Sequence, residues 1–336
     1  MDKEIKISNY TIGEDYPVFI IAEIGGNHNG SLDLALEMIT AAKYAGADAV
    51  KFQTYKTTEL LSPTSSFFKE FQKEELDAKS FKKIADYCQN NKIIFLSTPF
   101  DEASVDLLHD LGVPAFKIAS GDITHIPLIR YVANKKKPIL LSTGASTIKE
   151  ISIALDTIKE VSGVDVVLMH CVAKYPAPPQ ESNLKAIAEL KNRFGLVVGF
   201  SDHSTGIELS LASIILGAKV IERHFTKDKD LPGGDNKISL LPEEFSQLVN
   251  GIRNIEKALK NRNFEERSDS NIKNNIRRSI FIRRAIKKGE SLKMEDIVII
   301  RPAIGIAPSD INNIIGKRLK KNVPAGHVLQ WEDIEP

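Results

Sequence analysis

Between residues 18 and 224, eight short apolar runs each end in a polar or ionisable residue, and helix-like stretches separate them. Regular alternation of strand and helix is typical of β/α units with parallel strands. Eight such units predict an α/β fold of the TIM (β/α)8-barrel class, whose active site lies at the carboxyl ends of the strands. The predicted strands cover residues 18–23, 47–53, 93–98, 115–120, 138–143, 165–171, 196–203 and 218–224.

Helical periodicity fills most of the intervals between these strands. Ser31 or Asn29 is expected to cap the first helix and Gly46 to end it. The segment 57–79 is longer than a usual strand-to-helix connection, so we interpret it as a lid at the active-site rim. The predicted helices cover residues 31–44, 80–90, 102–111, 126–134, 147–162, 183–193, 206–216 and 242–260.

Length and charge restrict the class of partner. The 336 residues suffice for a barrel of about 250 residues and a small second domain. Because 45 Lys and Arg residues nearly balance 44 Asp and Glu residues, we expect a small-molecule partner, with no nucleic acid and no membrane. The first ten residues lack the apolar core of a secretory signal, which predicts a cytoplasmic protein. The two cysteines, Cys88 and Cys171, are interpreted as thiols.

The carboxyl-terminal part changes its period and predicts a separate domain. We place the barrel at residues 1–262, a polar linker at 263–276 and the second domain at 277–336. Strand-like runs in this domain cover residues 279–282, 297–300 and 328–330. Basic residues outnumber acidic ones here, and they form either a solvated face or cations that reach an anionic substrate.

Parity along the strands identifies one inward set of side chains, because residues two apart share a face. This set brings Lys51 and Lys117 together with Glu23 and Glu222. The lysines either pair with the glutamates, bind a phosphate or carboxylate, or form a Schiff base. We favour phosphate binding, because neighbouring strands supply neutral donors. These donors are the hydroxyl groups of Thr98, Ser120, Ser142 and Ser201.

Two histidines of matching parity, His203 and His224, end adjacent predicted strands. Imidazoles at neighbouring strand ends beside carboxylates suit a divalent transition metal with positions left open for substrate. Asp235 follows in a Pro/Gly turn and is expected to lie over this cup, where its carboxylate can hold sugar hydroxyls. The Asn27–Gly30 loop has two interpretations of equal weight: turn and capping chemistry without any ligand, or a part in the site.

At these positions the chain resembles the sialic acid synthases with their carboxyl-terminal antifreeze-like domain. Barrel motifs that carry the resemblance are IIAEIGGNHNG, GADAVKFQTY, FKIASGD, LLSTGAS, HCVAKYPAP, GFSDHSTGIE and VIERHFTKDKDLPGGD. The tail motifs RRSIFIRRAIKKGESL, IRPAIGIAP and KNVPAGHVL resemble the antifreeze-like, or SAF, domain of the β-clip type. The resemblance therefore covers almost the whole chain.

The resemblance implies a transferase that condenses phosphoenolpyruvate with N-acetylmannosamine or a related N-acylated aminosugar, giving N-acetylneuraminate or another nonulosonic acid and phosphate. It implies a divalent metal on His203 and His224, with manganese ahead of magnesium or cobalt, and Glu23 as the acid/base residue. Arg301 would reach the partner's site in a domain-swapped homodimer. Phosphoenolpyruvate-binding positions match Lys51, Thr98, Lys117, Ser120, Ser142 and Ser201, and sugar-binding positions match Gln53, Tyr175 and Asp235.

Two departures from the family pattern bear on the substrate. Ala173 stands where the family commonly carries Ser or Asn, and Gly233–Gly234–Asp235–Asn236 replaces the more usual Gly-Pro-Asp-His. Both departures bear on the identity and affinity of the sugar substrate more than on the reaction class. The alternatives are synthases of legionaminic or pseudaminic acid, which use diacetamido sugars. A non-catalytic ice-binding or carbohydrate-binding protein is disfavoured, because the tail is crowded with charged side chains.

Overall fold

The structure is a computed structural model, and it describes residues 4–161, 163–233, 235–260 and 270–336. The chain divides into two compact units, the first ending at Leu259 and the second beginning at Lys260. Among the described helices, none combines the length and the apolar character needed to cross a lipid bilayer.

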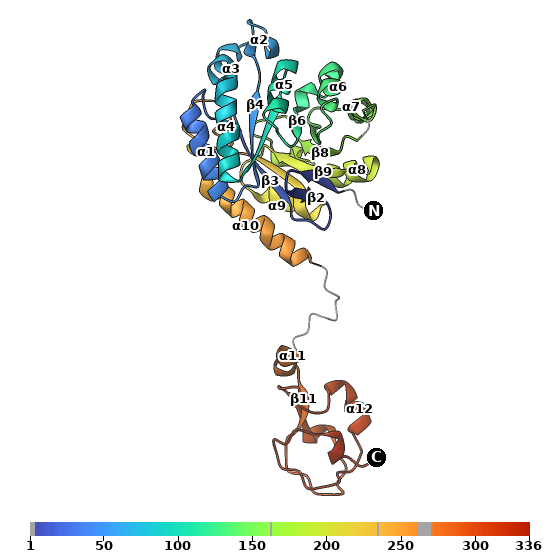
Figure 1. Ribbon diagram of the computed structural model, residues 1–336. Helices are drawn as coiled ribbons and strands as arrows, with labels where there is room; N and C mark the ends of the chain where they lie inside the picture. The colour runs from blue at the N-terminus through green and yellow to red at the C-terminus, as the bar shows by residue number, and fades with distance from the viewer. Residues whose placement is uncertain (1–3, 162, 234, 261–269) are drawn as a thin grey trace. The chain divides into compact units, whose positions relative to one another are not determined.

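The first unit is built on an eight-stranded parallel sheet in the hydrogen-bonded order β5-β4-β3-β10-β9-β8-β7-β6. The two end strands of this order, β5 and β6, contact each other, so the sheet closes into the predicted barrel (Figure 1). Each strand lies within two residues of its predicted start. Their bounds are β3 Phe19–Gly25, β4 Ala49–Thr54, β5 Ile94–Pro99, β6 Phe116–Ile118, β7 Ile139–Ser142, β8 Val166–Cys171, β9 Val197–Asp202 and β10 Val220–His224.

Helices follow the strands, and several begin at residues whose side chains accept a backbone hydrogen bond. Ser31 caps α1, Asp77 caps α4, Asp101 caps α5, and Thr147 forms a capping box at the start of α7. Bounds of the barrel helices are α1 Leu32–Tyr44, α4 Ala78–Asn91, α5 Glu102–Asp110, α6 Ile126–Ala133, α7 Ile148–Lys159, α8 Lys185–Phe194, α9 Glu208–Ile215 and α10 Pro242–Leu259. Two single turns, η1 Ser120–Asp122 and η2 Pro179–Glu181, follow β6 and β8.

An amino-terminal hairpin, which was not predicted, closes one end of the barrel. Its strands are β1 Ile5–Ile7 and β2 Tyr10–Ile12. Ile5, Ile7 and Ile12 are fully buried in one cluster with the inward residues at the starts of the barrel strands. Apolar residues therefore fill this end, and the polar residues occupy the opposite, carboxyl ends.

The long segment after β4, which we interpret as a lid, is partly helical, and this was not predicted. It contains two short helices, α2 Thr57–Leu60 and α3 Phe68–Glu74. Glu75 holds them together, because its carboxylate accepts hydrogen bonds from the amide and hydroxyl of Thr57 and from Lys56 Nζ at 2.8–2.9 Å. Short helices with few apolar residues leave a weak periodic signal, and this explains the difference.

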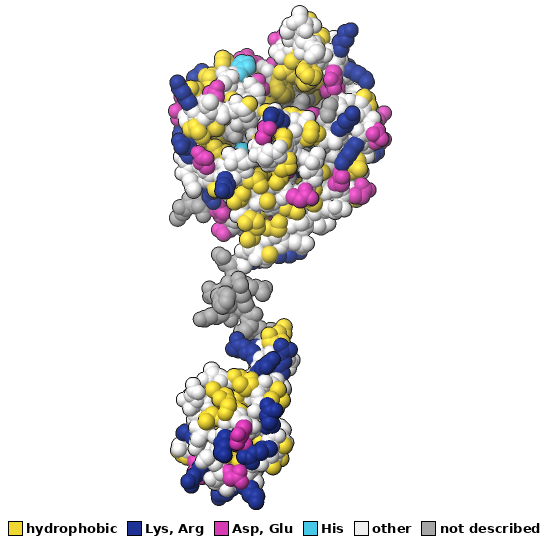
Figure 2. All heavy atoms as spheres, turned by 180° about the vertical axis from the view of Figure 1, so that it is seen from behind, with side chains coloured by type: hydrophobic (Ala, Val, Ile, Leu, Met, Phe, Trp, Pro, Cys, Tyr) yellow, Lys and Arg dark blue, Asp and Glu magenta, His cyan; other side chains and the backbone are white. Residues whose placement is uncertain are grey.

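The second unit has its own small apolar core, which includes Ile280, Leu292, Ile314, Leu319 and Leu329. The sheet strands agree with the first two predicted runs, but 328–330 forms only an isolated bridge between Val328 and Phe281. A helix covers the end of the predicted linker, while 261–269 lie outside the described residues. The elements are α11 Ser270–Ile276, β11 Ser279–Ile282, η4 Met294–Asp296, β12 Ile297–Ile300, η5 Pro308–Asp310, α12 Ile311–Ile314 and η6 Trp331–Asp333. Lys and Arg side chains are scattered over this unit in Figure 2.

Candidate active site

Strand alternation carries the apolar core into a polar cup at the carboxyl ends of the barrel strands. On β3, Phe19 and Ile21 belong to the inner core and Glu23 follows on the same face. Glu23 lies in register with Lys51 of β4 on one side and with His224 of β10 on the other. This residue therefore stands between one lysine, Lys51, and one histidine, His224, of the cup.

The two lysines form the ion pairs that we had considered as one of their roles. Lys51 Nζ lies 2.6 Å from Glu23 Oε2 and 3.8 Å from Glu222 Oε2, and Lys117 Nζ lies 3.4 Å from Glu222 Oε1. Lys51 also donates to Thr98 Oγ1 at 3.2 Å. All four ionisable side chains are buried, so each charge depends on its partners.

Burial and these partners shift the pKa values in opposite directions. Burial, which outweighs the attraction of Lys51, raises the pKa of Glu23 to about 7. Although burial alone would raise the pKa of Glu222, Lys117 and Lys51 lower it, so Glu222 is ionised. Burial lowers the pKa of Lys51, but Glu222 and Glu23 together raise it above its usual value. A Schiff-base amine needs a lowered pKa, so this alternative is disfavoured for Lys51.

The predicted hydroxyl groups lie at the ends of three strands and in one turn, and one of them, that of Thr98, contacts a lysine. Ser201 Oγ donates to Glu222 Oε1 at 2.9 Å, and Ser120 Oγ accepts from the amide of Gly144 at 3.0 Å. Ser142 is buried at the end of β7. Cys171, a free thiol, lies 3.0 Å from Ser120 Oγ. Four strands and one turn thus supply small donors beside two cations.

His203 and His224 face each other across the cup, with 5.5 Å between their ring centroids. Burial, together with the neighbouring imidazole, lowers the pKa of His203 to about 4. Burial likewise lowers the pKa of His224 to about 3. Both rings are therefore neutral and can donate a lone pair at neutral pH. Tyr175 stacks on His203 at 4.2 Å and meets the edge of His224 at 5.8 Å.

The surroundings of the ring nitrogens of His203 and His224 fit a role as metal ligands. His203 Nδ1 lies 2.8 Å from the carbonyl of Val172, so this nitrogen donates and Nε2 carries the lone pair, 3.3 Å from Ser201 Oγ. His224 Nδ1 is buried without a hydrogen-bond partner. No cluster of three or more metal-ligand side chains forms among the described residues. The pair therefore supplies two ligands, and the remaining positions would belong to water or substrate.

The residues predicted to hold a sugar lie around this pair. Gln53 Nε2 lies 3.5 Å from Glu23 Oε1, and Asp235 Oδ2 lies 3.7 Å from His224 Nδ1. Burial raises the pKa of Asp235. Ala173 is exposed just after β8, whereas Gly234 of the second departure lies outside the described residues. Arg301 is exposed in the second unit, directly after β12, and its role at the site stays a prediction.

Two acidic residues near the cup escaped the sequence analysis. Asp122 ends η1 beside Ser120, and burial raises its pKa to about 6. Glu74 ends α3, and burial raises its pKa to about 7, with further contributions from Glu70 and Asp235. Neither lies on a strand, so strand parity could not identify them. Asp122 is the last residue of the FKIASGD motif, and that position was its only available signal in the sequence.

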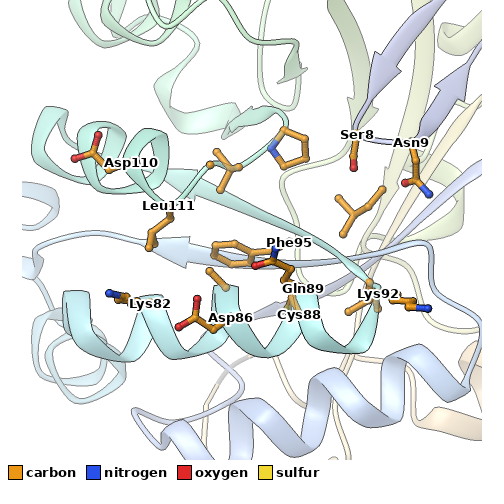
Figure 3. Close-up of a pocket in the computed structure, with 16 residues that line it drawn as sticks. Ser8, Asn9, Lys82, Asp86, Cys88, Gln89, Lys92, Phe95, Asp110 and Leu111 are labelled. Carbon is orange, nitrogen blue, oxygen red and sulfur yellow. The ribbon is translucent and has the colours of Figure 1, made fainter.

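A separate cavity of about 750 Å³ lies at the other end of the barrel wall (Figure 3). It is lined by the hairpin turn at Ser8 and Asn9, by α4, and by the residues after α5. Phe95 and Leu111 form much of its apolar wall, and the side chains of Lys82 and Asp86 lie along α4 at its edge. Because the buried ionisable residues lie at the opposite strand ends, this cavity is not the candidate active site.

Comparison with known proteins agrees with the geometry. Residues 38–264 match the NeuB family, and residues 277–335 match the SAF domain. The chain belongs to the NeuB family. This family member is 43% identical to the N,N'-diacetyllegionaminic acid synthase of Legionella pneumophila, over 96% of each chain. It is 32% identical to the N-acetylneuraminate-9-phosphate synthase of Mus musculus, over 96% of this chain and 94% of that protein.

Among solved structures, this NeuB-family chain resembles the N-acetylneuraminic acid synthetase of Leptospira borgpetersenii serovar Hardjo-bovis. The TM-score is 0.77 and the identity is 38%, with 81% of this chain and 95% of that chain covered. The barrel with its SAF domain and the membership in a family of nonulosonate synthases are thereby confirmed, and the protein is an enzyme.

Proposed function

We propose that the protein condenses phosphoenolpyruvate with an N-acylated aminosugar and water, releasing phosphate and a nonulosonic acid. The observation that carries this proposal is the position of Glu23 between two groups of residues. One group is cationic and rich in donors, around Lys51 and Lys117, and the other contains the neutral pair His203 and His224. Phosphoenolpyruvate fits the first group and the sugar aldehyde fits the second.

The charge balance of the first group supports binding of an anion. With Glu222 ionised and Glu23 able to hold a proton near neutral pH, the two lysines exceed the fixed negative charge. Thr98, Ser120, Ser142 and Ser201 add donors that carry no charge. A phosphate in this group would receive charge-assisted hydrogen bonds in a site that excludes water.

The reaction forms one carbon–carbon bond between the substrates and one carbon–oxygen bond to water, and it breaks the carbon–oxygen bond to phosphate. The methylene carbon of phosphoenolpyruvate attacks the aldehyde carbon, and the aldehyde oxygen takes up a proton. Water then adds to the electron-poor enol-ether carbon and loses a proton, and the resulting tetrahedral centre expels phosphate. Glu23 is positioned to give the first proton and to accept the second, so no net proton is consumed.

His203 and His224 would hold a divalent ion, for which we propose manganese. Such an ion supplies Lewis-acid polarisation of the aldehyde oxygen when bound. Tyr175 packs against both rings, and the Val172 carbonyl fixes the tautomer of His203. These contacts would orient the two histidines as metal ligands.

Two sugars are candidates for the second substrate. N-acetylmannosamine suits the general resemblance to sialic acid synthases. A 2,4-diacetamido-trideoxyhexose is favoured by relatives, because proteins named N,N'-diacetyllegionaminic acid synthase are 43% and 42% identical to this chain, against 32% for the N-acetylneuraminate-9-phosphate synthase of Mus musculus. We further propose a domain-swapped homodimer in which Arg301 completes the partner's site.

The test is release of phosphate from phosphoenolpyruvate with a panel of sugars, with the acid product identified by mass spectrometry. We expect release only when an aminosugar and a divalent ion are both present. His203→Ala with His224→Ala should abolish release and also abolish manganese retention in equilibrium dialysis. Full activity after thorough chelation would contradict the metal assignment, and phosphate release without any sugar would contradict the condensation.

A further inference from the structure

The end of α3 packs directly on two glycine loops at the rim of the cup. A Cβ at Gly26 would collide with the Glu74 carboxylate, and a Cβ at Gly30 would collide with the carbonyl of Lys73. At Gly233 a Cβ would lie 3.3 Å from Glu74 Oε1. Bare backbone at these glycines therefore allows the carboxylate of Glu74 to enter the space between the loop after β3 and the loop before Asp235.

Other contacts hold α3 in this position. The hydroxyl of Tyr55 donates to the carbonyl of Phe71 at 3.1 Å, and the tilted rings of the two residues lie 5.5 Å apart. Glu75 ties the end of α3 back to Thr57 and Lys56. The position of Glu74 is consequently set by the segment as a whole, and not by the rotamer of one exposed side chain.

Glu74 lies on the histidine side of the cup. Gly26 follows Gly25, where a Cβ would lie 3.2 Å from Glu23 Oε1 and 3.5 Å from Gln53 Nε2. Burial and the charge of Glu70 raise the pKa of Glu74 most, the nearby charge of Asp235 raises it further, and Lys73 has the weakest of the four influences. Asp235 in turn lies 3.7 Å from His224. Two carboxylates thus border the region proposed for the sugar.

We propose that Glu74 is a specificity-determining residue, which accepts hydrogen bonds from hydroxyl or amide N–H groups of a neutral aminosugar and excludes a phosphorylated one. The inference rests on the proposed function. A sugar phosphate carries about −1.5 to −2 charges at neutral pH. It would meet the carboxylates of Glu74 and Asp235, and the cation beside Glu74, Lys73, has the weakest influence on that carboxylate. The pKa of Glu74 is about 7, so its carboxylate is fully charged only above neutral pH. In the charged form it accepts hydrogen bonds from a neutral sugar and repels a phosphate, because like charges at a contact oppose binding strongly.

The experiment compares the wild type with Glu74→Gln, with Glu74→Ala as a second variant and Glu59→Gln as the control. Glu59 belongs to α2 of the same segment and is exposed, so its substitution removes one charge away from the cup. Phosphate release from phosphoenolpyruvate is measured with N-acetylmannosamine, its 6-phosphate and the diacetamido sugar. Melting temperatures verify that each variant is folded.

We expect wild-type enzyme to prefer the neutral sugars. Glu74→Gln should raise the KM of the neutral sugar, leave the KM of phosphoenolpyruvate unchanged, and lower the preference for neutral over phosphorylated sugar by about tenfold, since like-charge repulsion is removed. The control should keep the wild-type preference. An unchanged preference in both Glu74 variants would overturn this inference alone, as would a wild type that prefers the 6-phosphate. Inactivity of the wild type with every sugar would overturn the proposed function and this inference together.

Discussion

At the residue scale, the cup is a set of buried charges that compensate one another. Glu222 is the central anion, because Lys51, Lys117 and Ser201 all approach its carboxylate. Removing one partner from such a set leaves an uncompensated buried charge. Glu23 differs, since its raised pKa means that the protonated carboxyl is accessible at little cost. Substitutions of Glu23 therefore test chemistry more cleanly than substitutions of Glu222.

We predict that Glu23→Gln keeps the fold and loses most of the activity. The amide has the shape of the protonated carboxyl, so the melting temperature should stay close to that of the wild type. Loss of the proton-transferring group should lower kcat by about 10²–10⁴-fold with a small change in KM. Steady-state kinetics and thermal melts measure both. A variant with wild-type kcat would remove Glu23 from the proton transfers.

His28 gives a prediction about stability and pH. Its ring is buried beside Phe52, and burial lowers its pKa to about 4, below the usual 6.5. Because the folded-state pKa is depressed, the unfolded chain binds the proton more tightly below pH 6.5. The stability that neutral His28 allows at pH 7 is therefore lost as the pH falls from about 6.5 towards 4.

For this one group the loss between pH 7 and pH 5 should be about 2 kcal/mol, at 1.4 kcal/mol per pH unit below the unfolded pKa. Urea unfolding at the two pH values measures it, with His28→Gln as the comparison. The variant should depend less on pH than the wild type by this amount. Equal pH dependence in the two proteins would show that His28 does not titrate in this range.

At the scale of elements, short strands with one parity explain most of the site. In five strands the inner apolar residues and the polar ending lie on one face, as alternation predicts. These strands are β3, β4, β5, β9 and β10. Strand β1 of the hairpin also alternates, with Ile5 and Ile7 buried and Lys6 exposed, but only over three residues, and α3 has no buried residue. Three-residue strands and a seven-residue helix are too short for periodicity to identify them.

Truncation of one buried isoleucine in the hairpin should strongly lower the free energy of unfolding. Ile7→Ala should lower the free energy of unfolding of the barrel by about 2–5 kcal/mol, because Ile7 is fully buried against the inner core. Lys6→Ala on the same strand, where the side chain is exposed, should change it little. Denaturant unfolding of both variants provides the measurement. Equal, small effects would mean that the hairpin does not support the barrel.

At the scale of the whole molecule, the chain consists of two units with separate cores. Arg301 belongs to the second unit and the lysines and histidines of the cup belong to the first. If the proposed dimer is right, the tail of one chain serves the barrel of the other. A closed twofold arrangement then makes complementation between defective chains a direct test.

We predict that mixed dimers of Arg301→Ala and Lys51→Ala chains regain activity. Arg301→Ala alone should raise the KM of the sugar and leave the dimer intact. With random exchange of chains, about a quarter of all sites would combine an intact barrel with an intact partner tail, as twofold symmetry requires. Phosphate release at low sugar concentration, before and after co-refolding, measures it. Activity no higher than the average of the parents would contradict action of Arg301 across the dimer.

Periodicity along the chain is sufficient to predict the fold class and the inward residues of the cup. Strand periodicity is a local property, so the eight strands, the bounds of β11 and β12, and the inward positions of Glu23, Lys51, Lys117 and the two histidines follow from it. The effects of these groups on one another, in contrast, follow only from the folded chain. The partners of Glu222, the raised pKa of Glu23, and the approach of Glu74 to Gly26 depend on distances between segments far apart in the chain, and no local pattern encodes those distances.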